Sequence, residues 1–529
     1  MKPLRLLFAA ILVLAASPSF ALASKTQEST FQDDPLLVYG SPEQQIATLD
    51  TLQGFGVDRI RVSVFWALLA PANDQVQKPN VDTADPAAYQ EKVWAKYDHL
   101  IQAAQARGIL VNLNFTSPVP RWASTDSPRA DIQQTFNPNP EEFGKFVRAV
   151  GTRYSGSYNG LPRVDFWSIW NEPNQAGWLT PQWSPDPRPG SKSQIDAAPS
   201  IYRNLVAAAW QALADSGHGS DTILIGETAP QGQGNKKELT QSIDALKFIR
   251  RLYCVDNNIN VLKGAQASLR NCPGDIATFV AQNPALFRAT GYAHHPYALL
   301  TPPSRRSRNS DWVSMADLRA LSSELSRIYR RYRQKTQSRR GVPLYLTEYG
   351  YQTKPDPFAG KVVSFNRQAA WINQAEYMAF KNPNVRAVNQ FLLTDDAPVA
   401  GVDARKSPNL AWRTFQSGLK LLSGKRKVSY KAYMTPFFVK QQRVRRGRST
   451  GVFGMLRPAA PTTRERASIQ FRARGAKRWR TRRTVTVRGP RHYFETRVTV
   501  PSTGYLRIRW THGSRTLTSR TANVTAVRR

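Results

Sequence analysis

Short apolar runs alternate with amphipathic stretches along most of the chain. The runs are rich in Val, Ile, Leu and aromatic residues, whereas the stretches between them carry Ala, Leu, Gln, Lys and Arg at helical spacing. This alternation is typical of β–α units that build a parallel sheet. The predicted strands, in chain order, are residues 36–40, 58–66, 108–115, 164–172, 221–227, 290–297, 342–350 and 385–393.

Eight such units predict an α/β fold, a (β/α)8 TIM barrel over residues 36–440. An open, doubly wound sheet is the alternative, although no glycine-rich nucleotide-binding motif follows the first predicted strand. The polar residues 24–35 are predicted to be a loose leader. Helical spacing stops near residue 440, and short alternating runs punctuated by Gly, Pro and Ser follow. These runs predict a small all-β, Ig-like sandwich over residues 451–529, joined to the barrel by an Arg-rich linker, 441–450.

The N-terminus carries the pattern of a secretory signal peptide over residues 1–23. Lys2 and Arg5 precede the apolar run LLFAAILVLAA, and the residues at 21–23 form an Ala-Leu-Ala cleavage site. An uncleaved membrane anchor is the alternative, but the run is short for a span. We therefore expect a secreted, extracellular protein without stable membrane insertion after cleavage.

Positive charge is concentrated in the C-terminal tail. The chain of 529 residues has a net charge of +37, and its last 89 residues hold 23 Arg and Lys against two acidic residues, which gives +21. Such a surface attracts polyanions, and for an exported chain we expect an anionic cell-wall polymer as a partner rather than a nucleic acid. A genomic preference for Arg codons, with a solubilising surface as its result, is the alternative.

The chain has two cysteines, Cys254 and Cys272, separated by 18 positions. In an exported protein an isolated pair predicts a disulfide, which stabilises a loop of this size by about 3 kcal/mol in the loop-entropy model. A metal site would need more ligands than two thiols, and neither His nor Cys clusters beside them. A catalytic thiol is a further alternative.

Two acidic residues stand where strands of the predicted barrel end. Glu172 ends the fourth strand in DFWSIWNEPN, and Glu348 ends the seventh in VPLYLTEYG. Active sites of such barrels lie at the carboxyl ends of the strands, and strands four and seven face each other across the barrel mouth. Two facing carboxylates suit glycosidic bond cleavage, in which one acid protonates the leaving oxygen and the other meets the developing charge on the sugar carbon. A solvated turn acid is the alternative for Glu172.

The motifs WNEPN (170–174) and TEYG (347–350) together resemble those of the clan A retaining glycoside hydrolases, with families 5 and 39, the cellulase-like and xylosidase-like barrels, most similar. The resemblance implies that Glu172 is the acid/base and Glu348 the nucleophile, and that Asn171 holds the sugar 2-hydroxyl. It covers residues 36–440 and depends on the order and spacing of both motifs.

The resemblance extends to neighbouring strands. Arg61 matches the Arg on strand two that supports the nucleophile, and Tyr297, in the segment His295-Pro296-Tyr297, matches a Tyr that hydrogen-bonds it. One departure concerns strand eight, where the clan often has a Trp under the sugar but this chain has Gln390 and Phe391. Arg61, His295 and Tyr297 are also candidates for substrate binding. A surface or ion-pair role is the alternative for Arg61, and a structural role is the alternative for His295.

Three further residues are candidates for substrate binding. Trp66 ends the second predicted strand and Trp122 lies on the loop after the third, and either could stack on a sugar face; Glu227 ends the fifth strand. Loop packing, or for Glu227 a helix-start position, is the alternative. The six His residues are scattered, so we expect neither a metal nor another cofactor.

The sequence therefore predicts a secreted retaining β-glycosidase that hydrolyses β-linked oligo- or polysaccharides with two glutamates. The alternative is a non-catalytic glycan-binding or wall-associated protein built on the same barrel.

Overall fold

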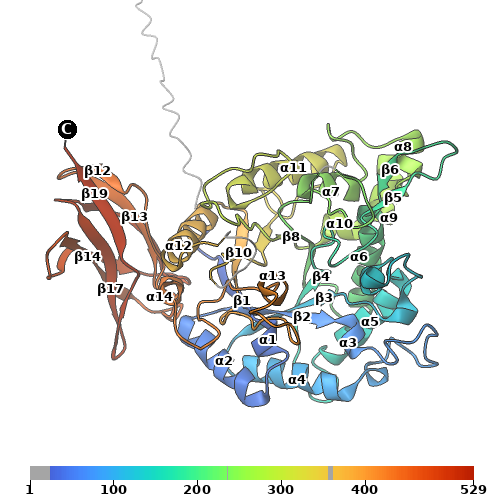
Figure 1. Ribbon diagram of the computed structural model, residues 1–529, viewed down its shortest axis with the longest axis horizontal. Coiled ribbons are helices and arrows are strands. Elements are labelled where there is room, and N and C mark those ends of the chain that lie inside the picture. Colours follow the sequence, from blue (N-terminus) through green and yellow to red (C-terminus); the bar gives the residue numbers. More distant parts are fainter. Residues whose placement is uncertain (1–23, 235, 355–361, 529) are drawn as a thin grey trace, which may run out of the picture.

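The computed structural model describes residues 24–234, 236–354 and 362–528. It shows a closed barrel of eight parallel strands, ringed by helices and followed by a separate β-sandwich (Figure 1). The predicted fold class is therefore confirmed. The predicted signal peptide, residues 1–23, lies outside the described residues. Within the described part of the chain, no helix is both long enough and apolar enough to cross a membrane.

The barrel strands pair in the ring order β1-β10-β9-β8-β7-β4-β3-β2. Parallel pairing throughout brings all their carboxyl ends to the same mouth of the barrel. The strands are β1 Glu28–Gln32, β2 Arg59–Phe65, β3 Leu110–Thr116, β4 Phe166–Ile169, β7 Thr222–Thr228, β8 Gly291–His294, β9 Leu344–Leu346 and β10 Val385–Phe391.

The first strand lies earlier than the sequence pattern predicts. The predictions of a strand at 36–40 and of a loose leader at 24–35 are wrong, because β1 occupies Glu28–Gln32 within that leader and helix α1 occupies Asp34–Leu37. The side chain of Asp33 caps α1 by accepting a hydrogen bond from the Leu36 amide. The β1 sequence ESTFQ is mostly polar, yet four of its five residues are buried inside the protein, so hydrophobicity alone does not reveal this strand. The other seven barrel strands lie within the predicted segments, except that β3 and β7 each end one residue later.

Several helices around the barrel, among them α2, α5 and α12, begin with a side-chain cap. In α5, for example, Asn139 accepts hydrogen bonds from the amides of Glu141 and Glu142, Pro140 opens the first turn, and Phe143 and Phe146 are buried. The principal helices are α2 Pro42–Phe55, α4 Glu91–Gln105, α5 Pro140–Arg153, α6 Ala198–Asp215, α7 Ala245–Leu252, α11 Leu318–Arg331, α12 Phe365–Phe380 and α14 Val428–Met434. The shorter ones are α3 Trp66–Leu69, α8 Gly264–Ser268, α9 Ile276–Gln282, α10 Pro284–Arg288 and α13 Pro408–Ala411, and a small hairpin, β5 Trp183–Pro185 with β6 Gln194–Asp196, follows β4.

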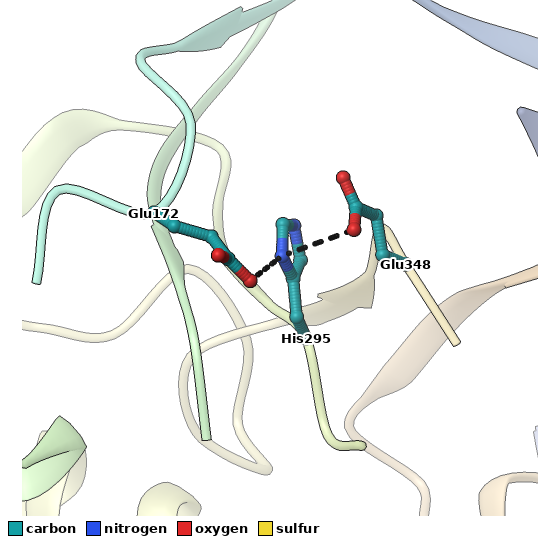
Figure 2. Close-up of side chains that lie close together, drawn as sticks. All are labelled: Glu172, His295 and Glu348. Carbon is teal, nitrogen blue, oxygen red and sulfur yellow. Dashed lines mark hydrogen bonds and ion pairs between the residues drawn. The ribbon is translucent and has the colours of Figure 1, made fainter. Parts of the chain in front are cut away.

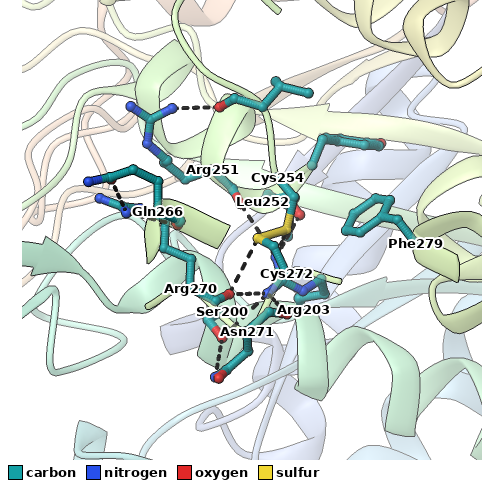
Figure 3. Close-up of a disulfide and its surroundings, with 12 residues drawn as sticks. Ser200, Arg203, Arg251, Leu252, Cys254, Gln266, Arg270, Asn271, Cys272 and Phe279 are labelled. Atoms are coloured by element: carbon teal, nitrogen blue, oxygen red, sulfur yellow. Dashed lines mark hydrogen bonds between the residues drawn. A yellow bond between two sulfur atoms is a disulfide. The ribbon is translucent and has the colours of Figure 1, made fainter. Parts of the chain in front are cut away.

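Cys254 and Cys272 form the predicted disulfide (Figure 3). Beside it lies the buried side chain of Arg203, on α6, which donates hydrogen bonds to the carbonyls of Leu252, Arg270 and Asn271. A guanidinium has five N–H donors, so one side chain can satisfy several loop carbonyls at once. The disulfide and Arg203 together fix the loop between α7 and α9 against α6.

The C-terminal domain consists of two packed sheets. The smaller contains β11 Phe437–Val439, β13 Ser449–Met455 and β16 Tyr493–Thr499, and the larger contains β12 Arg443–Arg445, β14 Glu465–Ala473, β15 Arg480–Val487, β17 Gly504–His512, β18 Arg515–Thr518 and β19 Ala522–Val527. Their inner faces share one core, with Ile469, Leu506 and Trp510 among its members. Pairing is antiparallel except between β12 and β19.

The predicted linker, 441–450, is part of this sandwich. It contains β12 and the start of β13, so the linker prediction is wrong. Val444 is buried between the exposed Arg443 and Arg445, which is the inward–outward alternation of a strand rather than the composition of a flexible segment.

The sandwich contacts the barrel through a buried interface. Phe380 of α12 packs against Phe453 and Tyr493, and Glu376, one helical turn earlier, pairs with the buried Arg457. Figure 1 shows the sandwich beside α12 and α14.

Candidate active site

Glu172 and Glu348 meet at the carboxyl ends of the barrel strands. Glu172 follows β4 and Glu348 follows β9, and one carboxylate oxygen of each, together with a ring nitrogen of His295, lie within 4.8 Å of one another (Figure 2). Glu172, Trp170 and Glu227 all have positive φ values, which side-chain-bearing residues rarely adopt. Strained backbone of this kind gathers at functional sites, where the surrounding structure holds it in place.

The Glu348 carboxylate is buried and accepts two hydrogen bonds. Arg61 Nη1 lies 3.0 Å from Oε1, and the Tyr297 hydroxyl donates to Oε2 at 3.0 Å. Burial raises the pKa of Glu348, the charges on His295 and Arg61 oppose this shift, and the neighbouring Glu172 and Glu227 carboxylates reinforce it. Ionisation of Glu348 is therefore less favourable here than in water, and Arg61 and His295 are the groups that limit this effect.

Arg61 contacts several of the buried side chains beneath the cleft. Its buried guanidinium also donates to Gln32 Oε1 at 2.5 Å, to Asn171 Oδ1 at 2.7 Å and to Glu227 Oε2 at 3.1 Å. Since the side chain is 2% exposed, it cannot contact a substrate directly, so the prediction that it binds substrate is wrong. It orients Asn171 and Glu348 instead.

His295 joins Glu172 to a third buried acid. Its Nδ1 lies 2.8 Å from Glu172 Oε1 and its Nε2 lies 2.8 Å from Glu227 Oε2. Burial lowers the pKa of His295, but Glu348, Glu172 and Glu227 outweigh it and raise the pKa to about 10. The ring is therefore an imidazolium at neutral pH, with both nitrogens donating to carboxylates, and has no lone pair to offer a metal ion.

Glu227 is the counter-charge for both cations. Burial raises its pKa, but Arg61 and His295 outweigh that effect and hold the pKa at about 2. Thr347 also donates its hydroxyl to Glu227 at 2.6 Å. Because Glu227 and His295 are both fully buried, the predictions that they contact substrate are wrong. They position Glu172, a role that the sequence pattern did not indicate.

A cleft of about 470 Å³ opens above the two glutamates. Asn171 and Tyr297 line it, in keeping with their predicted contact with substrate. Tyr39 stacks on Phe65 at one side, and Phe391 meets Phe415 edge to face at another. The sequence pattern did not indicate most of the other residues that line the cleft, which include Gln32, Asp34, Tyr39, Phe65, Gln175, Gln231, Asp396 and Phe415.

Residues 22–386 match the sequence profile of the Cellulase family, glycosyl hydrolase family 5. The chain belongs to glycosyl hydrolase family 5. The matched segment contains every strand of the barrel up to the start of β10, and with them both glutamates. No curated protein sequence matches the chain.

Solved structures similar to this family 5 chain include other glycoside hydrolases. A family 39 glycoside hydrolase from the gut symbiont Bacteroides cellulosilyticus WH2 has 13% identity and a TM-score of 0.48, over 96% of this chain and 80% of that one. A monomeric β-xylosidase from Caulobacter crescentus CB15 has 14% identity and a TM-score of 0.46, over 91% of this chain and 95% of that one.

The two tryptophans predicted to bind substrate lie outside the cleft of the family 5 chain. Trp66 is 0% exposed and stacks on Phe146 in the core, so its prediction is wrong. Trp122 packs edge to face on Trp66 and donates its indole N–H to the Pro71 carbonyl at 3.0 Å. It is partly exposed but is not among the residues that line the cleft. Aromatic residues after a strand thus pack between helix and barrel as readily as they face sugar.

Proposed function

We propose that this family 5 chain is an exported retaining β-glycosidase that acts by double displacement. The short separation of Glu172 and Glu348 is the observation that carries the proposal, because their nearest oxygens lie within 4.8 Å. Retaining enzymes place their carboxyl groups roughly 5–5.5 Å apart, whereas inverting enzymes leave about 6.5–9.5 Å for a water molecule between them. The disulfide also fits an oxidising, extracellular compartment.

In the first step the Glu348 carboxylate attacks the anomeric carbon while Glu172 gives its proton to the leaving oxygen. The bond between the anomeric carbon and that oxygen breaks, and the sugar is held as an ester on Glu348. In the second step the Glu172 carboxylate takes a proton from water, the water oxygen attacks the anomeric carbon, and Glu348 leaves as a carboxylate. Two inversions at the same carbon give net retention.

Each step has a supporting contact. Arg61 and the Tyr297 hydroxyl hold both oxygens of Glu348, and so favour the ionised form that attacks. The imidazolium of His295 holds Glu172 and stabilises the carboxylate that remains after the proton has moved.

The cleft lining favours a neutral sugar beside the glutamates. It contains several aromatic side chains and the carboxylates of Asp34 and Asp396, but no Lys or Arg among the described lining residues. Carboxylates accept hydrogen bonds from sugar hydroxyls and repel acidic sugars, and aromatic faces suit the apolar face of a pyranose.

The test is the anomeric form of the first product, read by NMR while aryl β-glycosides and β-linked oligosaccharides are hydrolysed. Retention at the earliest time points is expected. An initial product of inverted configuration would contradict double displacement. Tight binding of a glycan without turnover across the whole panel would instead favour the non-catalytic alternative.

We also propose that the sandwich binds an anionic cell-wall polymer. A half-buried platform formed by Arg472, Trp479, Tyr505 and Arg507 supports this, since the guanidinium carbons of Arg507 and Arg472 lie 4.1 Å and 5.1 Å from the Trp479 ring centre. Both acids of the domain are engaged elsewhere, Glu465 with Trp510 and Glu495 with Lys381 and Lys440. The platform thus presents ordered positive charge without a neighbouring counter-charge in the described chain.

Binding of this protein to an anionic wall polymer is expected to weaken steeply as salt rises, because the interaction releases counterions. Sedimentation with isolated polymer at increasing NaCl measures this directly. The variant Arg472→Gln/Arg507→Gln should bind several-fold more weakly, whereas Arg448→Gln/Arg488→Gln removes the same charge outside the platform. If both variants lost affinity for the polymer to the same extent, or if the affinity did not change with salt, a specific binding platform would be contradicted.

A further inference from the structure

A second hollow adjoins the catalytic cleft on the loop after β8. Its volume is about 370 Å³, and it is lined by residues of the segment 297–314 together with Gln231. Gln231, Tyr297 and Leu299 line both the hollow and the catalytic cleft. The two spaces are therefore contiguous, and a glycan that passes the glutamates has a direct path into the hollow.

Three arginines line this hollow, Arg305, Arg306 and Arg308. All three are exposed, and none forms an ion pair with a carboxylate of the described residues. The nearby acids have other partners: Asp311 pairs with Arg250, and Asp317 accepts hydrogen bonds from Ser307 and Ser314. Three positive charges thus surround the hollow without local neutralisation.

The hollow also offers an apolar surface. Leu299 and Leu300 are 51% and 39% exposed at its rim, and the Trp312 ring lines it, held by an indole N–H bond of 2.6 Å to Asp244 Oδ1. Leu299 lines both spaces, and it adopts a φ of 50°, an unusual conformation for a residue with a branched side chain. Apolar side chains and an indole suit the C–H face of a sugar ring.

The charge of the hollow is opposite to that of the cleft. The cleft presents the carboxylates of Asp34, Glu172, Glu348 and Asp396, whereas the hollow presents only arginines as charged groups. A uniformly neutral glycan would make no use of this asymmetry, while a uniformly acidic one would be repelled beside the glutamates. The lining fits a substrate that is neutral at the bond that is cleaved and anionic nearby.

We infer that the hollow is a subsite for a hexuronic acid unit of the substrate. Guanidinium groups bind carboxylates through paired, charge-assisted hydrogen bonds, and the Leu299–Leu300 rim with Trp312 supports the ring of the same sugar. This inference rests on the proposed glycosidase function for its substrate class, and it adds that the glycan is mixed, with neutral and acidic units.

Binding to the inactive variant Glu348→Gln tests the inference without turnover. Calorimetry would compare pairs of β-linked oligosaccharides that differ only in whether one unit is a hexose or the corresponding hexuronic acid. In this background the uronate member should bind about tenfold or more tightly, with a difference that shrinks as salt is raised. Adding Arg305→Gln/Arg306→Gln/Arg308→Gln should abolish the difference.

The matched control is Lys335→Gln/Arg339→Gln/Arg340→Gln. It removes three exposed charges from the segment that precedes β9, at the opposite end of the barrel, and should keep the preference for the uronate member. The subsite would be overturned if Glu348→Gln showed no preference for the uronate member, or if that preference survived in the variant that also lacks the three arginines (the hollow variant). Failure of both members to bind across the oligosaccharide panel would also overturn it.

The two proposals fail differently. If wild-type protein hydrolyses none of the oligosaccharides but the uronate preference follows the three arginines, the glycosidase proposal fails and the subsite stands. If wild-type protein hydrolyses neutral and uronate members with equal kcat/KM, and the hollow variant leaves that ratio unchanged, the subsite fails while the glycosidase stands.

Discussion

Replacing Glu348 with Gln is expected to lower kcat/KM by on the order of 10⁴-fold or more, because an amide cannot form the covalent sugar ester. The two hydrogen bonds that Arg61 and Tyr297 donate to the carboxylate would be partly kept by the amide oxygen. The barrel should therefore remain folded, with a thermal midpoint close to that of the wild type. Steady-state kinetics on an aryl β-glycoside, together with thermal unfolding, separates loss of chemistry from loss of structure.

The variant Glu348→Ala sharpens this result, because it leaves room for a small anion where the carboxylate was. Azide should restore turnover and yield a glycosyl azide of inverted configuration, since only one displacement then occurs. Glu238→Gln serves as the control, because this exposed acid lies outside the residues that line the cleft. Hydrolysis by Glu348→Gln at the wild-type rate would rule out Glu348 as the nucleophile.

The sequence was sufficient to predict the barrel and its two facing acids because those features leave local signals. Parallel strands buried on both faces are apolar runs, and seven of the eight stand out in this way. Glu172 and Glu348 each interrupt such a run at its end, so their meeting follows from the ring order of strands four and seven.

The features that the sequence concealed depend on contacts between distant residues. Strand β1 is polar because its side chains hydrogen-bond inside the barrel, as Gln32 does with Arg61. Glu227 and His295 were candidates for substrate contact, but no local pattern distinguishes a strand-end acid that faces the cleft from one buried beneath it. Trp66 likewise follows β2, and only the helix packed above it decides that it belongs to the core.

The sequence also does not reveal which arginines of the basic tail are exposed and which are buried. The Arg-rich segment 441–450 was predicted to be a linker, yet it contributes strands to the sandwich, because arginines alternate with inward-facing residues there. Arg457 and Arg520, in the same basic tail, are buried at the junction with the barrel. Composition shows that the tail is basic, but only the structure separates arginines that face solvent from those that hold the domains together.

Replacing Glu376 with Ala is expected to destabilise the protein by about 3–5 kcal/mol, because it leaves the Arg457 cation buried without its partner. Glu376 lies on α12 of the barrel, whereas Arg457 follows β13 of the sandwich, and both are nearly inaccessible to solvent. The Arg457 guanidinium also lies 3.9 Å from the ring centre of Tyr433, so it cannot turn towards water without disrupting the interface. Unfolding in urea, followed by fluorescence, measures the loss.

The control for this prediction is Glu141→Ala, which breaks an exposed i,i+4 pair with Lys145 and should cost less than about 1 kcal/mol. The double variant Glu376→Leu/Arg457→Met should regain most of the lost stability, because apolar side chains of similar size replace both charges.

Since the pair joins the two domains, the wild type should unfold in one transition, and Glu376→Ala should lower the stability of barrel and sandwich together. Two separate transitions in the wild type, or an unchanged midpoint in Glu376→Ala, would show that the domains are held by other contacts. In that case the aromatic cluster of Phe380, Phe453 and Tyr493, rather than the ion pair, would account for the junction.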